Sequence, residues 1–148
     1  MTPSTTTSNL MSLVSRALIA LLFIPSGIAK ITGFSGTVAY ITSANVPFPE
    51  VAAVIAILVE VGLGLLLLVG YQTRWVALAM FLFVIVLPFT FHAYWSVPPE
   101  RMTLERIMFF KDLAIAGGLL AFATWGAGGW SIDGMRTRAP SAGVVSAA

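Results

Sequence analysis

Five ionisable side chains interrupt otherwise apolar stretches of this sequence: Lys30, Glu60, His92, Lys111 and Asp112. Glu60 lies at the midpoint of VAAVIAILVEVGLGLLLLVG, residues 51–70, and is the only charge in that run. An ionised carboxylate at the centre of a bilayer costs at least about 2–3 kcal/mol, so it should face protein or water rather than lipid. Buried together, such groups can pair with one another, donate hydrogen bonds to a ligand or pass protons. The five residues therefore predict a polar site inside an apolar protein.

The composition places this protein in a membrane. The 148 residues are 58% hydrophobic and 9% charged, with a mean hydropathy of +0.95, whereas about 25% of an average soluble domain is charged. The absence of cysteine excludes disulfides, thiolate-ligated metals and iron–sulfur clusters held by this chain. The single histidine argues against the usual two-histidine metal sites. We therefore expect no metal site and no intrinsic cofactor, and the net charge of +2 does not indicate nucleic-acid binding.

The sequence predicts an all-α integral membrane four-helix bundle with up-down-up-down topology. About 20 apolar residues cross the roughly 30 Å of a bilayer core, and the predicted spans are residues 9–31, 51–70, 75–95 and 104–125. They form one domain, residues 9–133, between a disordered tail at 1–8 and a flexible tail at 134–148. The first span also resembles a signal peptide, because Arg16 precedes an apolar stretch. No small-x-small cleavage site follows, which favours a retained helix.

This topology brings the five ionisable residues into the same half of the bundle. Lys111 is the expected partner of Glu60, because its long stem can reach deeper into the membrane, and Lys30 or His92 can compete for the same carboxylate. A structural role stays open, because a buried ion pair can fix helix register and His92 can belong to an interfacial aromatic belt. At the opposite surface we expect Arg16 and Asp133 to form a structural polar pair.

Several segments in this order resemble the DoxX family of small bacterial four-helix membrane proteins. They are LIALLFIPSGIAKITGF after Arg16, then VPFPE, LVEVGLGLLLLVGYQTR, FHAYW, FFKDLAIAGGLL and GGWSID. The resemblance covers residues 16–133 and implies the four-helix fold. The polar positions that match the family are Arg16, Lys30, Glu60, His92, Lys111 and Asp133. Where the family often has Lys-Asn, this chain has Lys111-Asp112, which adds a carboxylate.

The family is named from a subunit of an archaeal thiosulfate:quinone oxidoreductase, and the resemblance implies a membrane subunit of an oxidoreductase system. Such a subunit would bind a quinone or a small oxyanion, with His92, Lys30 and Lys111 as hydrogen-bond donors. Electrons would come from a redox partner subunit or soluble enzyme, because the chain lacks redox-active groups of its own. Enzymatic activity itself stays an open question.

Two other functions compete with this one: a non-enzymatic membrane anchor or assembly factor for a soluble partner, and a small transporter or proton path using Glu60. A homo-oligomer would help the transporter interpretation, because four spans are few for that task. We expect the protein in the bacterial inner (plasma) membrane, with both termini cytoplasmic near Arg16, Arg74, Arg136 and Arg138.

Overall fold

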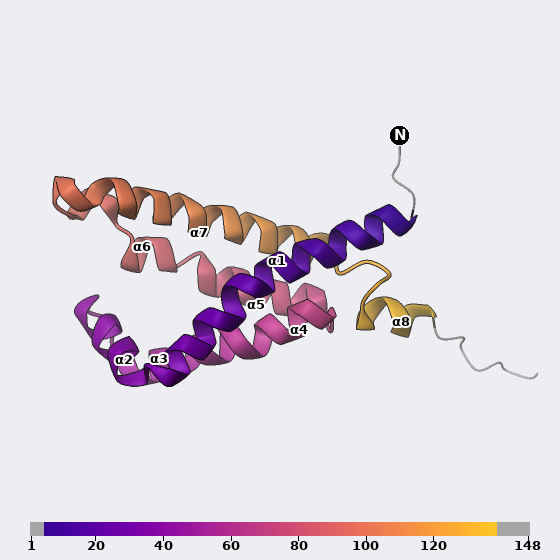
Figure 1. The fold of residues 1–148 in the computed structure, drawn as a ribbon, viewed down its shortest axis with the longest axis horizontal. Coiled ribbons are helices and arrows are strands. Elements are labelled where there is room, and N and C mark those ends of the chain that lie inside the picture. The colour runs from indigo at the N-terminus through magenta and orange to yellow at the C-terminus, as the bar shows by residue number, and fades with distance from the viewer. Residues whose placement is uncertain (1–4, 139–148) are drawn as a thin grey trace, which may run out of the picture.

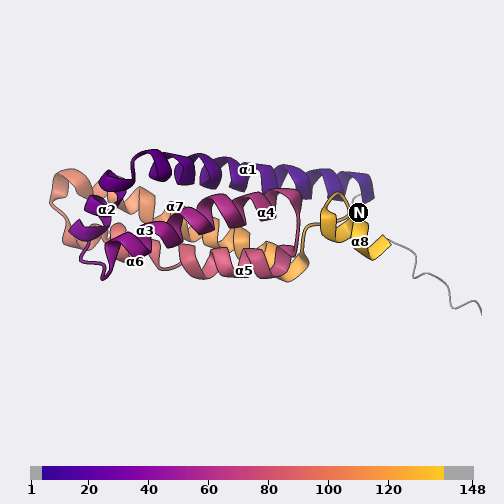
Figure 2. The same ribbon diagram turned by 90° about the horizontal axis from the view of Figure 1, so that it is seen from below.

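The computed structural model describes residues 5–138, which are mostly helical and contain no strand. Four helical rods run up, down, up and down (Figures 1 and 2), and each is long and apolar enough to span a membrane. They are α1 (Thr5–Thr32); α3 (Pro49–Ile57) continued by the π-helix η1 (Leu58–Leu63) and α4 (Gly64–Val69); α5 (Thr73–Val84) continued by α6 (Leu87–Phe91) and the 3-10 turn η2 (Tyr94–Ser96); and α7 (Pro99–Trp125). The predicted fold class is confirmed.

The observed boundaries extend the predicted spans at several ends. The first helix begins at Thr5, so residues 5–8 of the predicted tail are helical. The second and fourth spans begin at Pro49 and Pro99, because proline fits the first turn of a helix, where its missing N–H needs no partner. Two short helices lie outside the spans, α2 (Phe34–Ser43) and α8 (Ile132–Arg138). The remainder of the predicted tails, residues 1–4 and 139–148, lies outside the described residues.

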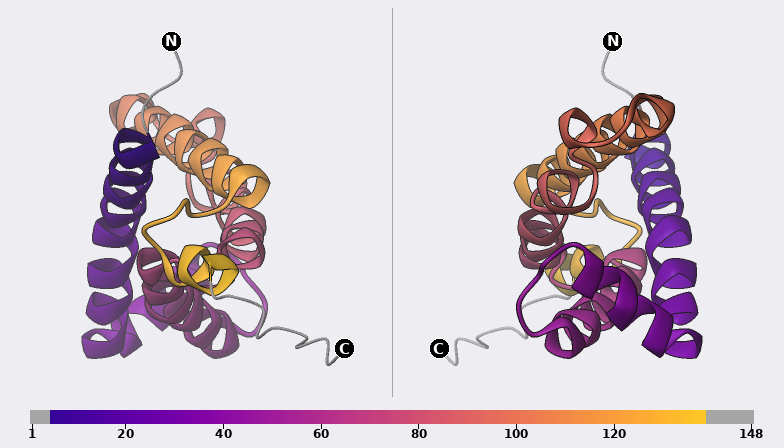
Figure 3. Two further views of the ribbon diagram at one scale, coloured as in Figure 1. Left: turned by 90° about the vertical axis from the view of Figure 1, so that its right-hand side faces the viewer. Right: turned by 90° about the vertical axis from the view of Figure 1, so that its left-hand side faces the viewer.

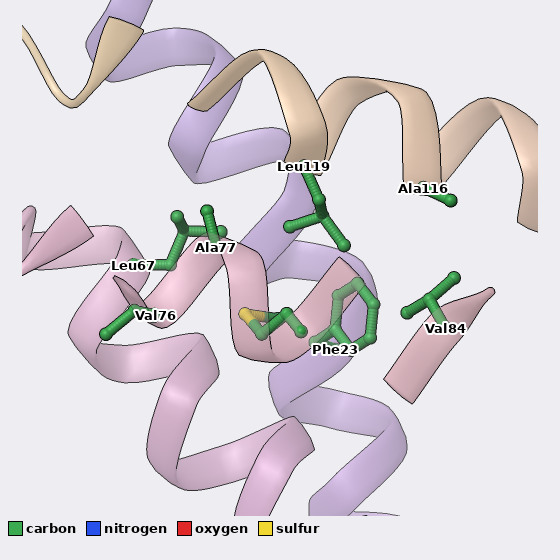
Figure 4. Close-up of a cluster of buried hydrophobic side chains, with 8 residues drawn as sticks. Phe23, Leu67, Val76, Ala77, Val84, Ala116 and Leu119 are labelled. Carbon is green, nitrogen blue, oxygen red and sulfur yellow. The ribbon is translucent and has the colours of Figure 1, made fainter. Parts of the chain in front are cut away.

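The apolar core lies where all four spans meet. It consists of Phe23, Leu67, Val76, Ala77, Met80, Val84, Ala116 and Leu119 (Figure 4). Here α5 packs along α7, and α1 packs along η1 and α4. Many large apolar side chains, such as Leu21 and Trp125, are instead exposed on the outside of the bundle, as expected for helices whose solvent is lipid.

The bundle divides into two helix pairs that diverge toward one end. In Figure 1, α1 with α3 and α6 with α7 spread apart toward the left, where α2 lies. We call this the α2 end, and we call the opposite one, which holds the start of α1 and α8, the terminal end. The two panels of Figure 3 face the terminal end and the α2 end in turn. Tyr40 of α2 stacks on Phe91 of α6 with ring centroids 5.3 Å apart, so α2 contacts both diverging pairs.

Arg16 and Asp133 hold the terminal end together, each through backbone groups. Arg16 is fully buried, and its guanidinium donates to the carbonyl oxygens of Leu68 and Trp130, both at 2.6 Å. The Asp133 carboxylate accepts from the backbone N–H groups of Gln72 and Thr73, both at 2.8 Å. The expected direct ion pair is not among the contacts of residues 5–138, because both side chains are engaged with the α4–α5 turn and its surroundings.

We predict that Asp133→Asn lowers the free energy of unfolding by about 1 kcal/mol at neutral pH, because Asp133 caps the start of α5. Burial alone would raise the pKa of Asp133, but hydrogen bonds from Thr73 and Gln72 outweigh it and hold the pKa below its ordinary 3.8. The stabilisation is therefore complete above the ordinary pKa and is lost as pH falls through the lower, folded-state value. Thermal unfolding in detergent at neutral and acidic pH checks this. A variant with the same acid sensitivity as the wild type would contradict it.

Candidate functional site

A pocket of about 370 Å³ lies between the diverging helix pairs at the α2 end. Apolar side chains from all four spans and α2 form most of its wall, including Phe23, Ile41, Ala52, Phe83 and Ile115. The five ionisable residues singled out from the sequence also line it: Lys30, Glu60, His92, Lys111 and Asp112. An apolar cavity with a few convergent polar groups is the usual form of a small-molecule site.

Lys30, rather than Lys111, is the partner of Glu60. The Lys30 ammonium donates to Glu60 Oε2 and to Ser26 Oγ, both at 2.8 Å. The Glu60 side chain is only 8% exposed. Lys111 belongs to the opposite helix pair, and its side chain is 44% exposed, with the ammonium 3.5 Å from Asp112 Oδ1. The divergence of the pairs thus separates the two residues that were expected to meet.

Local backbone geometry positions Glu60 against the first helix. Glu60 lies in η1, the π-helical segment of the second span, and π-helical turns inside longer helices occur frequently at functional sites. Gly27 of α1 faces this turn, where a Cβ would lie 2.6 Å from Val61 Cγ2 and 3.0 Å from Glu60 Cβ. The lack of a side chain at Gly27 therefore lets α1 approach η1 closely enough for Lys30 to reach Glu60.

Gly27→Ala should lower the free energy of unfolding by about 1–2 kcal/mol, because the added methyl group overpacks a tight helix–helix contact. Val61 is β-branched and has little rotameric freedom with which to move aside. Gly36→Ala is the matched control, since a Cβ there meets no atom within 4 Å. Thermal unfolding of both variants measures the difference. Equal stability would mean that the α1–η1 contact relaxes without cost.

His92 is held by a carboxylate that the sequence analysis missed. Its Nδ1 lies 2.8 Å from Oε2 of Glu105, and Oε1 of the same carboxylate accepts from Arg101 at 2.6 Å. Glu105 is buried, although its place among charged residues at the start of the predicted span 104–125 favoured a solvated position. The spacing of Glu105, Phe109, Asp112 and Ala116 at four, three and four residues places them on one helix face, and this pattern was the available signal.

The polar groups at this end of the pocket are thus paired on opposite sides, and on one side the partners of His92 lie behind the pocket wall. Lys30–Glu60 lies on the α1 and η1 side, and the group Arg101–Glu105–His92 lies on the α6 and α7 side, with Asp112 Oδ2 3.8 Å from His92 Nε2. Tyr40, which also lines the pocket, was likewise not singled out from the sequence. Over residues 5–138, no three acidic or histidine side chains gather closely enough to hold a metal ion.

The fold and the pocket define a small integral membrane protein with four helical spans. The model of the DoxX family matches residues 11–93, and the chain belongs to this family. It is 35% identical to the inner membrane protein YphA of Escherichia coli over 82% of this chain and 86% of that protein. It is 40% identical to the E. coli inner membrane protein YqjF over 82% of this chain and 88% of that protein.

A shorter part of the chain is similar to part of a larger protein. The surfeit locus protein 4 homolog of Schizosaccharomyces pombe is 33% identical over 46% of this chain and 23% of its own length. No solved structure matches the chain.

Proposed function

We propose that this protein is the membrane component of an oxidoreductase system and binds a neutral, quinone-class ligand in the pocket at the α2 end. The observation that supports it most is the combination of an apolar wall with a polar end whose charges are paired. An apolar wall suits a lipid-soluble ring and tail, and hydrogen-bonding groups at one end suit the oxygens of its head.

Charge pairing favours a neutral ligand over the small oxyanion. Each cationic group that lines the pocket stands beside a carboxylate: Lys30 beside Glu60 at 2.8 Å and Lys111 beside Asp112 at 3.5 Å. His92 is likewise hydrogen-bonded to Glu105. An anion would therefore meet carboxylates together with the cations. Its transfer from water into the apolar pocket would also cost desolvation free energy.

The redox role requires a partner. The chain contains no cysteine and a single histidine, so in this proposal the electrons come from a partner subunit or a soluble enzyme. The names of the two E. coli relatives favour the inner membrane. We also propose that both termini are cytoplasmic, which places the pocket near the opposite surface.

Native mass spectrometry of the protein, extracted from bacterial membranes in mild detergent, tests this proposal. We expect a retained molecule with the mass of a cellular quinone or quinol, which is lost on His92→Phe and kept in Glu100→Gln. Glu100 is an exposed acid at the same end that does not line the pocket. A stoichiometric protein partner with no small molecule would instead support the anchor or assembly function.

A further inference from the structure

A second hollow, separate from the pocket at the α2 end, lies at the terminal end of the bundle. This groove of about 640 Å³ is bounded by the end of α7, the glycine-rich loop that follows it, the start of α5 and α8. α8 lies beyond the last span (Figure 2), so the groove is where the spans end, at the membrane surface. The residues that bring charge or an aromatic ring to the groove are Arg74, Arg136, Asp133 and Trp125.

Close backbone contacts shape this groove. α8 packs against the loop through Gly134, where a Cβ would lie 2.7 Å from the carbonyl oxygens of Gly128 and Gly129. Arg74 extends from the start of α5 toward the same loop, because its Nε would lie 3.6 Å from a Cβ on Gly126. The groove therefore has a floor of small residues, with one arginine from α5 and another from α8.

The two arginines of the groove are exposed, and neither forms an ion pair within residues 5–138. The guanidinium of Arg136 lies over the ring of Tyr71, with its Cζ 5.4 Å from the ring centroid. Asp133 also lines the groove, but its carboxylate already accepts hydrogen bonds from backbone N–H groups at the start of α5. Both guanidinium groups can therefore bind an anion from outside the chain.

The distribution of charge favours an anion in this groove rather than in the pocket at the α2 end. Four of the six acidic residues lie at or near the α2 end and Glu60 is buried in the second span, which leaves Asp133 as the acid of the terminal end. Arginine binds phosphate through parallel N–H groups. Trp125 is 77% exposed and lines the groove, and tryptophan favours the level of lipid headgroups. A phosphate at this level belongs to a membrane lipid, whose acyl chains can lie along the apolar end of α7.

We propose that the groove at the terminal end binds the headgroup of an anionic phospholipid, with Arg74 and Arg136 holding its phosphate and Trp125 beside its acyl chains. This inference goes beyond the proposed function and does not depend on it. The competing explanation is that exposed arginines at one end reflect membrane topology alone. In that case anionic lipid would respond to the net charge of the protein and not to these two residues.

Native mass spectrometry of the full chain in mild detergent tests this inference, with phosphatidylglycerol and phosphatidylcholine of the same acyl chains as probes. We expect one phosphatidylglycerol to bind at least about tenfold more tightly, because each basic residue near an anionic headgroup contributes a factor of about five. Arg74→Gln together with Arg136→Gln should remove this preference and leave the affinity for phosphatidylcholine unchanged. Arg136→Gln alone should weaken phosphatidylglycerol binding by about fivefold.

Arg106→Gln is the matched control, because it removes an exposed arginine near the α2 end that lines neither the groove nor the pocket. It should keep the preference for phosphatidylglycerol. An equal loss in Arg106→Gln, or equal binding of the two lipids to the wild type, would overturn the inference. Thermal unfolding without added lipid should give the double variant the midpoint of the wild type, which separates lost binding from lost folding.

A competition experiment distinguishes a lipid from a soluble phosphate ester, which offers the same chemistry to the two arginines. Glycerol 3-phosphate at the concentration of the lipid should leave phosphatidylglycerol bound, because it lacks the acyl chains that lie beside Trp125. Displacement of the lipid at equal concentrations would assign the groove to a soluble phosphate ester and would overturn the inference of a lipid site.

Discussion

Lys30→Met should lower the free energy of unfolding by about 3 kcal/mol, because it leaves Glu60 buried without its cation. The Glu60 side chain is 8% exposed, and Lys30 is its only ion-pair partner among residues 5–138. Methionine keeps the length and most of the packing of lysine, so the loss reports the charge. Reversible thermal or denaturant unfolding in mild detergent measures it.

A double-mutant cycle shows whether the two residues act as a pair. Lys30→Met together with Glu60→Leu should be more stable than Lys30→Met alone, because the second change removes the stranded carboxylate. Lys111→Met supplies the control cycle: combined with Glu60→Leu it should show no coupling, because the Lys111 ammonium lies 3.5 Å from Asp112 and belongs to the opposite helix pair. If Glu60→Leu rescued Lys111→Met as it rescues Lys30→Met, the assignment of Lys30 as the partner of Glu60 would be wrong.

Arg16→Met should cost about 3 kcal/mol through the loss of two charge-assisted hydrogen bonds at the terminal end. The guanidinium joins α1 to the carbonyl oxygens of Leu68 and Trp130, which belong to the second span and to the segment after α7. Unfolding in detergent measures the loss. Arg16→Lys should recover only part of the stability, because an ammonium lacks the planar fork that reaches both carbonyls.

Arg74→Met is the control for Arg16, since it removes an exposed arginine at the same end of the bundle. We expect it to leave the unfolding midpoint nearly unchanged. If the Arg16 and Arg74 variants lost similar stability, the buried contacts of Arg16 would not be what joins these segments.

The sequence predicts the fold well because lipid imposes simple rules on it. Backbone groups cannot remain unpaired in a bilayer, so four apolar runs had to be four helices. Short connections between them then determine that Lys30, Glu60, His92, Lys111 and Asp112 line one pocket. These inferences depend on length, order and hydropathy, all of which can be read without coordinates.

The pairing inside the pocket could not be read in the same way. It depends on how far the helix pairs diverge, on the π-helical turn that carries Glu60 and on the close contact at Gly27. A buried carboxylate needs a cation, and in the sequence Lys30 of the first span and Lys111 of the fourth span meet this need of Glu60 equally well. Glu105 was missed for a related reason, because charged residues at the start of a predicted span are typical of a solvated position even when one face of the helix is buried.

The central claim is that the pocket at the α2 end binds a quinone-class ligand, and filling the pocket tests it most directly. We would titrate decylubiquinone and its quinol form onto nanodiscs that contain the wild type, Ala52→Phe or Ala114→Phe. Ala52 lines the pocket, whereas Ala114 is exposed and outside it. We expect saturable binding of at least one form to the wild type and to Ala114→Phe, and at least about tenfold weaker binding to Ala52→Phe. Equal uptake by all three proteins would mean that the probe dissolves only in the lipid, which would contradict the claim.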